Sequence, residues 1–165
     1  ALGNSVRTGP RRIIAEIIEL KGLDEIEEHK DKIRGKIVFS NGPMDPTLIE
    51  TFTAYGATVS ERSSGAAQTG PYGAKFVIVR SMTQSLDDIP HAGSLRYKAG
   101  VKALPAMAIS TKDANLLSQL LKGQADLHIH MKIMLRCFQK LSLLTLLVNS
   151  MALYYQTNRL LSEAI

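Results

Sequence analysis

Tryptophan is absent from this sequence, cysteine occurs once, and aromatic residues make up only 5% of the 165 positions. The single cysteine, Cys137, excludes a disulfide framework and a zinc site built from several thiolates. Few aromatic rings also leave little surface on which nucleic-acid bases could stack. Long basic runs are missing as well, because the twenty Lys and Arg are scattered among fifteen Asp and Glu. The net charge of +5 therefore indicates no polyanion, and we expect no nucleic-acid partner.

The residues given show no secretory leader. They begin with ALGNSVRTGP, without an initiator methionine, a basic segment or the apolar core of a signal peptide. We therefore expect Ala1 to follow a cut, with further sequence upstream of it.

What is present is the composition of one ordinary domain, with 45% hydrophobic and 21% charged residues. Short apolar runs alternate with amphipathic ones over residues 1–132, which predicts an α/β domain. We expect Gly56 and Gly65 to interrupt the second helix, and Thr111 to cap the third. The apolar run 76–79 is expected near the centre of the sheet. The expected strands are 11–20, 35–41, 74–81, 104–110 and 125–132, and the expected helices are 23–33, 47–69 and 111–124.

A polar loop occupies residues 82–104, longer than the ~12 to 15 residues at which a structureless connection becomes unusual. It gathers two aspartates with His91, Arg96 and Tyr97, but contains no nucleophile and no cofactor motif. The missing nucleophile disfavours a self-contained catalytic site here. Two interpretations are favoured over it, a surface that faces a ligand or partner and ordinary loop chemistry. His91, Arg96 and Tyr97 are the candidates for such a surface, and no catalytic residue is assigned.

Two histidines, His128 and His130, alternate on the last expected strand and point to one face. Zinc needs at least a third protein ligand, and only Asp126 lies nearby on that face. The pattern favours a half-exposed strand at the edge of the sheet over a bound metal, so we assign no metal ligand.

Five stretches, in order, resemble one known family. They are ALGNSVRT, GKIVFSNGPM, YGATVSERSSGAAQTGPYGAKFVIVRSMT, IPHAGSLRY and LPAMAISTKDANLLSQLLKGQ. Their order and spacing are similar to the protease-associated domain of the zinc peptidases related to plasma glutamate carboxypeptidase and the aminopeptidases. The resemblance covers residues 1–132 and stops abruptly there.

The resemblance implies an accessory role. In that family the domain is inserted into a two-zinc exopeptidase and lies beside or over the active site, where it shapes access for short peptides. It implies a secreted or periplasmic parent, often a homodimer, whose other domain binds both zinc ions. The family's zinc motif begins just after this domain with Gly-Gly-His-Leu-Asp, and no such motif is legible here. We therefore expect this chain alone to be inactive, with no cofactor of its own.

The tail, residues 133–165, is crowded with leucine and almost uncharged. Its most apolar run, LSLLTLLVNSMALYY, has fifteen residues and contains Asn149 and Ser150, whereas a membrane span needs about 20. No membrane span is therefore expected. An apolar C-terminal helix remains possible, and with it a competing function: a non-enzymatic α/β binding domain that self-associates or pairs through that helix.

The genetic code offers another explanation of the tail. If Arg159 to Ile165 are written CGA TTA TTG TCG GAG GCC ATT, a shift of frame yields Ile-Ile-Val-Gly-Gly-His, and the stop codon that follows then reads as Leu. The same shift turns Thr145 to Asn149, written ACG TTA TTG GTG AAT, into Val-Ile-Gly-Glu. In the resembling family that strand precedes the zinc motif. The tail is thus predicted to be the start of the peptidase domain read out of frame, with the shift near Lys132 to Met134.

Overall fold

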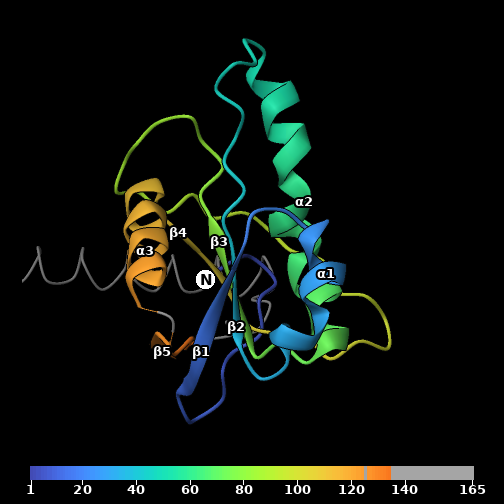
Figure 1. The fold of residues 1–165 in the computed structure, drawn as a ribbon. Coiled ribbons are helices and arrows are strands. Elements are labelled where there is room, and N and C mark those ends of the chain that lie inside the picture. Colours follow the sequence, from blue (N-terminus) through green and yellow to red (C-terminus); the bar gives the residue numbers. More distant parts are fainter. Residues whose placement is uncertain (125, 135–165) are drawn as a thin grey trace, which may run out of the picture. The chain divides into compact units, whose positions relative to one another are not determined.

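The computed structural model describes residues 1–124 and 126–134, and within them an α/β unit built on one five-stranded sheet. The strand order is β4-β3-β2-β1-β5 (Figure 1). Neighbouring strands among the first four are parallel, and β5 pairs antiparallel with β1 at the edge. The strands are β1 (Ile13–Leu20), β2 (Ile37–Ser40), β3 (Phe76–Arg80), β4 (Ala106–Ile109) and β5 (His128–Met131).

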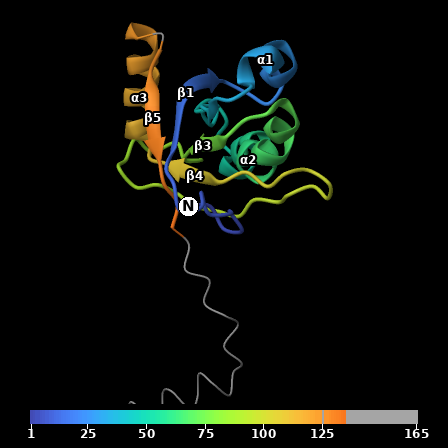
Figure 2. The same ribbon diagram turned by 90° about the horizontal axis from the view of Figure 1, so that it is seen from below.

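Helices cover both faces of the sheet. α1 (Glu25–Ile33) and α2 (Thr51–Thr69) lie on one face, and α3 (Thr111–Gly123) lies on the other (Figure 2). A short 3-10 turn, η1 (Gly70–Tyr72), follows α2. The α/β fold expected from the sequence is therefore confirmed, since all five predicted strands and three predicted helices are present.

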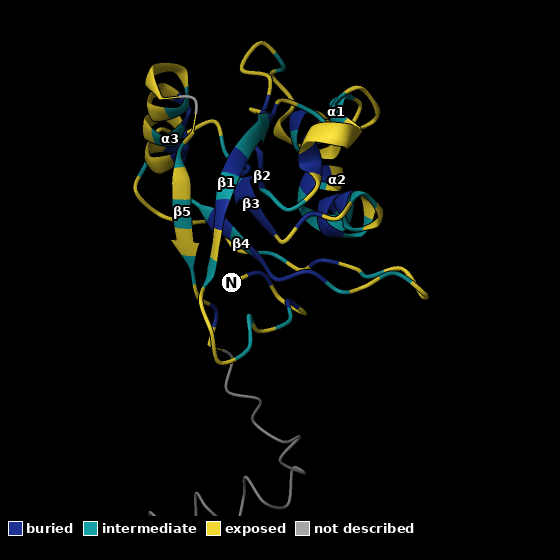
Figure 3. Ribbon diagram, turned by 60° about the horizontal axis from the view of Figure 1, so that its bottom comes forward, coloured by how far each residue is buried: buried dark blue, intermediate teal, exposed yellow. Residues whose placement is uncertain are grey.

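The sheet separates two apolar cores. Val38 and Val77 point toward α1 and α2, whereas Phe39 and Phe76 point toward α3. This alternation follows from the period of two along a strand. Both faces of β2 and β3 are consequently buried, as the dark strands in Figure 3 show. The prediction that the run 76–79 lies inside the sheet is confirmed.

Different segments of the chain lie at the two ends of the parallel strands. At the edge where the parallel strands begin, the backbone N–H of Thr8 donates to the carbonyl of Ile133 (3.3 Å), and the N–H of Ile133 donates to Oγ1 of Thr8 (3.2 Å). The first and last described segments therefore run side by side there (Figure 2). At the opposite edge, called here the carboxyl edge, β1 to β4 end, and the helices α2 and α3 begin on this side (Figure 1).

α2 differs from its prediction at its start and in its middle. It begins at Thr51 rather than Thr47, because Oδ1 of Asp45 accepts hydrogen bonds from both the N–H (2.8 Å) and the hydroxyl (2.7 Å) of Thr47 and holds a turn. Gly56 and Gly65 do not interrupt it, so that expectation is wrong. Gly65 is buried, and a Cβ there would lie 3.7 Å from a methyl of Leu23, so packing overrides the weak helix propensity of glycine.

The cap of α3 is also one residue earlier than predicted. Oγ of Ser110 accepts the N–H of Asp113 at 3.0 Å, so Ser110 is the cap and Thr111 is the first helical residue. The hydroxyl of Thr111 is used instead to hold the long loop.

From position 135 onward, the tail lies outside the described residues. The apolar helix and the shift of reading frame therefore stay predictions. Within the described part of the chain, no helix combines the length and apolar character that crossing a membrane requires.

Candidate functional site

The first part of the long loop, residues 82–91, crosses the carboxyl edge and is fastened to the start of α3. Oγ1 of Thr111 accepts the N–H of Asp87 (2.9 Å) and donates to the carbonyl of Ser85 (2.9 Å). Nζ of Lys112 lies 3.0 Å from a carboxylate oxygen of Asp88. The sequence predicted a loop here, and the structure adds that it is held in one place.

A second segment, residues 42–52, rises beside this loop at the carboxyl edge (Figure 1). Nε2 of Gln84 bridges the two segments by donating to the carbonyl oxygens of Asp45 (3.2 Å) and Leu48 (3.4 Å). Between them lies a cavity of about 250 Å³ lined by Met44, Thr51, Phe52, Tyr55, Met82, Thr83, Gln84 and His91. We call these two segments and their cavity the tip.

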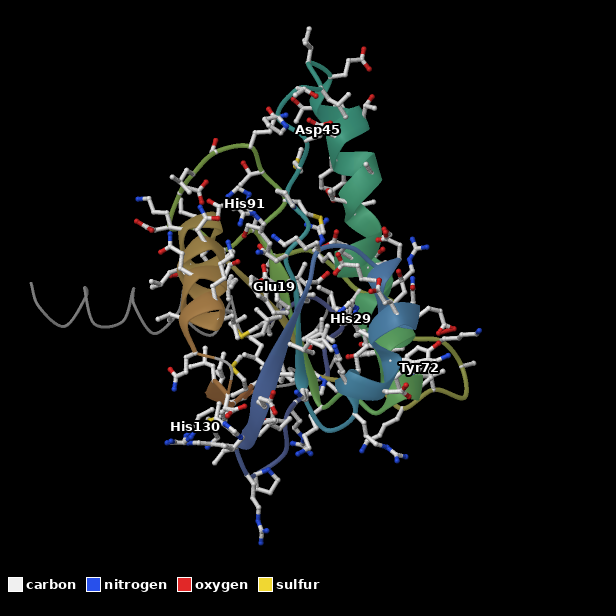
Figure 4. All side chains as sticks on the ribbon, viewed as in Figure 1. Glu19, His29, Asp45, Tyr72, His91 and His130 are labelled. Carbon is white, nitrogen blue, oxygen red and sulfur yellow. The ribbon has the colours of Figure 1, made fainter. Side chains whose placement is uncertain are left out.

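His91 lies in the loop of the tip and lines its cavity (Figure 4). Its Nε2 lies 3.4 Å from Oδ2 of Asp87, and its backbone N–H donates to Oγ of Ser81 at 2.7 Å. The side chain is 38% exposed, so the imidazole is oriented by a carboxylate yet open to solvent. Such a ring can donate a hydrogen bond to a peptide group or accept one from it.

Arg96 and Tyr97 lie elsewhere, against a second cavity of about 580 Å³ between α1, α2, η1 and the later part of the loop. The hydroxyl of Tyr97 donates to the carbonyl of Leu104 (2.6 Å) and accepts the N–H of Val6 (3.1 Å). Tyr97 thus ties the loop to the first residues of the chain, while Arg96 is exposed and its backbone N–H donates to Ser63 (2.8 Å). The structure does not bring the three predicted residues into one cavity, and whether they face a substrate or partner stays a prediction.

Beneath the tip lies a buried carboxylate that sequence reasoning missed. Glu61 of α2 is 6% exposed and accepts hydrogen bonds from Oγ of Ser40 (2.7 Å) and the N–H of Gly42 (3.1 Å). Burial raises the pKa of its carboxyl, the two hydrogen bonds act in the opposite direction, and the negative charges of Asp24 and Glu25 raise it further. The sign of this buried carboxylate in the sequence is a glutamate that stands among the small residues of α2.

A polar network at the carboxyl edge was missed too. Nη1 of Arg80 donates to Oδ1 of Asn41 (3.2 Å) and Oδ1 of Asn115 (2.7 Å). Asn41 and Asn115 are 39 and 35 positions from Arg80 in the sequence, so no local pattern indicates these contacts.

The histidine pair of β5 is exposed at the edge of the sheet, and Nδ1 of His128 lies 3.0 Å from the carbonyl oxygen of Asp126. Across residues 1–124 and 126–134, no three His, Cys, Asp or Glu side chains gather closely enough to hold a metal ion.

No protein-family model matches the chain. Carboxypeptidase Q from Homo sapiens and from Mus musculus are each 30% identical to it over 131 residues, which is 79% of this chain and 26% of each relative. The chain thus spans about a quarter of the length of the curated relatives it matches. A solved structure, a peptidase M28 precursor from Shewanella amazonensis, is 32% identical with a TM-score of 0.74, over 80% of this chain and 30% of that chain. In sequence and in fold, this chain is related to one segment of these peptidases.

Proposed function

We propose that residues 1–132 are a protease-associated domain, the accessory domain of a two-zinc exopeptidase that acts on short peptides. In this proposal the domain lies beside the active site of a peptidase domain and limits which peptides reach it. The relationship to carboxypeptidase Q and to an M28 peptidase supports the proposal, and so does the short span of those relatives that this chain covers.

The observation that carries the proposal is the apolar tip. Ile49 and Phe52 are 98% and 91% exposed, and Leu86 and Ile89 of the neighbouring loop are more than half exposed. Scattered apolar residues are normal on a surface, but these four lie on two adjoining segments, and Phe52 lines the cavity between those segments. An apolar surface of this kind marks a site of contact with another molecule or domain. The tip is thus the face proposed to meet the peptide or the peptidase domain.

The opposite edge of the sheet suits the attachment. The hydrogen bonds between Thr8 and Ile133 hold the first and last described segments side by side there. Domains whose two ends lie close together are readily inserted into another domain. Held at that edge, the domain would leave its tip, at the other end of the parallel strands, available for contact.

The chemistry would belong to the parent enzyme. Two zinc ions in its peptidase domain would activate water and polarise the peptide carbonyl. His91 of the tip, oriented by Asp87, would contact the bound peptide by hydrogen bonding, and Arg96 and Tyr97 would face a partner on the other cavity. By the same resemblance the parent is proposed to be secreted or periplasmic and homodimeric.

We further propose that the residues beyond about 132–134 are read out of frame, which would explain why the zinc motif is missing from this chain. Sequencing the encoding DNA tests this directly. The codons for Leu160 to Ile165 must regroup into Gly-Gly-His after a one-base shift, and codons that do not regroup would refute it.

Activity tests the accessory role. With zinc added, the purified chain is expected to leave dipeptides intact, whereas a frame-restored protein is expected to hydrolyse them. In the frame-restored enzyme, Phe52→Ser should raise KM for dipeptides several-fold with a smaller effect on kcat. Ile14→Ser, at a half-exposed site on β1, serves as the control and should leave both constants unchanged. Zinc-dependent turnover by the present chain, or equal kinetics in both variants, would overturn the proposal.

A further inference from the structure

A crevice at the carboxyl edge, separate from the cavity at the tip, is built from the ends of three strands. Lys21 follows β1, Asn41 follows β2, and Arg80 is the last residue of β3. The other wall is α3, which contributes Asn115, Ser118, Gln119 and Lys122 to a space of about 310 Å³. In open α/β sheets, ligands bind in the crevice outside the carboxyl ends of the parallel strands. The position is therefore one at which this architecture commonly binds small molecules.

The charge that lines this crevice is positive. Lys21, Arg80 and Lys122 all line it, and none of the described residues that line it is Asp or Glu. One carboxylate, Glu19, contacts two of the lining residues: its oxygens accept hydrogen bonds from Nδ2 of Asn41 (2.6 Å) and Oγ of Ser118 (2.8 Å). Glu19 also lies 3.9 Å from Nζ of Lys21, so it offsets part of one of the three charges. An excess of positive charge remains at the surface of the crevice.

Arg80 is the residue that distinguishes this crevice from a set of mobile surface lysines. Its guanidinium is oriented by the amide oxygens of Asn41 and Asn115, and both hydrogen bonds use the same nitrogen, Nη1. Among the described residues, no carboxylate lies within 4.0 Å of it. Partial burial lowers the pKa of Arg80, which reflects a cation that has lost part of its water without gaining an anion. Within residues 1–124 and 126–134, the hydrogen bonds of the Arg80 side chain use Nη1 and leave Nε and Nη2 without a protein acceptor. The fork formed by Nε and Nη2 is the part of a guanidinium that binds a carboxylate or phosphate through two parallel hydrogen bonds.

From this arrangement we infer that the crevice binds an oxyanion, carboxylate or phosphate, carried by a small ligand. Arg80 supplies the paired hydrogen bonds, Lys21 and Lys122 supply further positive charge, and the amides of Asn115 and Gln119 lie where the rest of the ligand would contact α3. The inference concerns a cavity other than the one at the tip and does not depend on the proposed accessory role.

Titration of the isotope-labelled chain by nuclear magnetic resonance tests the inference. The probes are inorganic phosphate, acetate, and an N-acetylated dipeptide with either a free or an amidated C-terminus. We expect saturable shifts of the backbone amides of Asn115 and Gln119 with the oxyanions and none with the amidated peptide. Higher ionic strength should weaken the binding. Tighter binding of the free dipeptide than of acetate would identify a peptide carboxylate as the source, and tighter binding of phosphate would identify a phosphate group.

Substitutions of a cation at one end of β3 and of a cation just before its other end give a matched comparison. Arg80→Gln should weaken binding about tenfold or more, because a hydrogen-bonded ion pair is removed. Arg80→Lys, which keeps the charge and loses the fork, should fall between that variant and the wild type. Lys75→Gln removes an exposed cation just before the other end of β3 and should change nothing. Circular dichroism of each variant verifies folding. Absence of saturable shifts with every oxyanion, or equal affinity in Arg80→Gln, would overturn the inference.

Discussion

The middle of the parallel strands and their carboxyl ends are chemically opposite, although they are only one or two residues apart. Phe39 and Ile78, which lie opposite each other on β2 and β3, are 0% and 2% exposed and pack in the apolar core beneath α3. Directly after Phe39 come Ser40 and Asn41, and β3 likewise ends in Arg80. The buried middle accounts for folding, whereas the polar ends bind one another, hold two loops and leave donors available at the surface. This division separates positions that fix stability from positions that can serve a function.

The largest effect is expected from cutting a side chain out of the middle layer. Phe39→Ala should lower the free energy of unfolding by about 3 to 5 kcal/mol, because the removed ring leaves a cavity in a closely packed core. Urea denaturation measures the loss. Phe52→Ala at the tip, where the ring is 91% exposed, is the matched control and should change stability by no more than about 0.5 kcal/mol. Similar losses in the two variants would remove the distinction between middle and edge.

A smaller loss is expected at the carboxyl edge from Gly42→Ala. A Cβ at Gly42 would lie 1.8 Å from Oε1 of Glu61, so the buried carboxylate must leave its hydrogen bonds with Ser40 and the Gly42 N–H. The expected cost is about 1 to 3 kcal/mol, the range for unpaired buried polar groups. Gly56→Ala, with nothing within 4 Å of the added methyl, should instead stabilise by about 0.5 to 1 kcal/mol. Urea denaturation of the two variants measures both effects. A loss of stability in both variants would contradict the prediction.

A smaller loss of stability is expected when the long loop is released from the start of α3. Thr111→Val removes the hydroxyl that holds Asp87 and Ser85, and the expected loss is about 1 to 2 kcal/mol. Hydrogen exchange at the amide of Asp87 should speed up, because its acceptor is gone. Thr53→Val alters an exposed threonine of α2 and should do neither. Unchanged exchange at Asp87 would show that the loop is held by other contacts.

The smallest expected effect is a change in the pH dependence of stability. Because the pKa of Glu61 is raised above the ordinary value of 4.5, the folded state keeps a proton that the unfolded chain has released. The free energy of unfolding therefore falls as pH rises from about 4.5 through the raised pKa. Glu61→Gln, which can still accept both hydrogen bonds, should remove that fall.

Asp45 gives the opposite sign for comparison. The hydrogen bonds from Thr47 lower the pKa of its exposed carboxyl below 3.8, so its contribution is lost as pH falls through the lowered pKa. Asp45→Asn should therefore alter the acid side of the profile and leave the region above pH 4.5 as in the wild type. Denaturation midpoints recorded across pH separate the two. A fall that persists unchanged in Glu61→Gln would contradict the assignment.

Much of the fold was predictable because its signals are local. The apolar run 76–79 and the amphipathic pattern that became α3 each identified their element from its own residues. The errors arose where contacts distant in sequence compete with local signals. Gly65 lies inside α2 because it packs near Leu23. The hydroxyl of Thr111 is bound to the loop residue Asp87, and Ser110 caps α3 in its place.

The candidate site was predictable only in part. The length and polarity of residues 82–104 identified a loop worth attention, and His91 was selected from it. Arg96 and Tyr97 were grouped with His91 by closeness in sequence, whereas the fold places them against another cavity. Glu61 and Arg80 were missed because their partners are 19 to 39 positions away.

The sequence by itself determined the order of strands and helices, the buried interior of the sheet and the likeness to a peptidase segment, since periodicity and motif order are properties of the chain as written. Only the tertiary structure decided which polar residues meet. Parallel strands bring their carboxyl ends to one edge, so Asn41, Arg80 and Asn115 become neighbours there. Each of these hydrogen bonds joins segments that only the folding of the whole sheet places within 3.2 Å of each other.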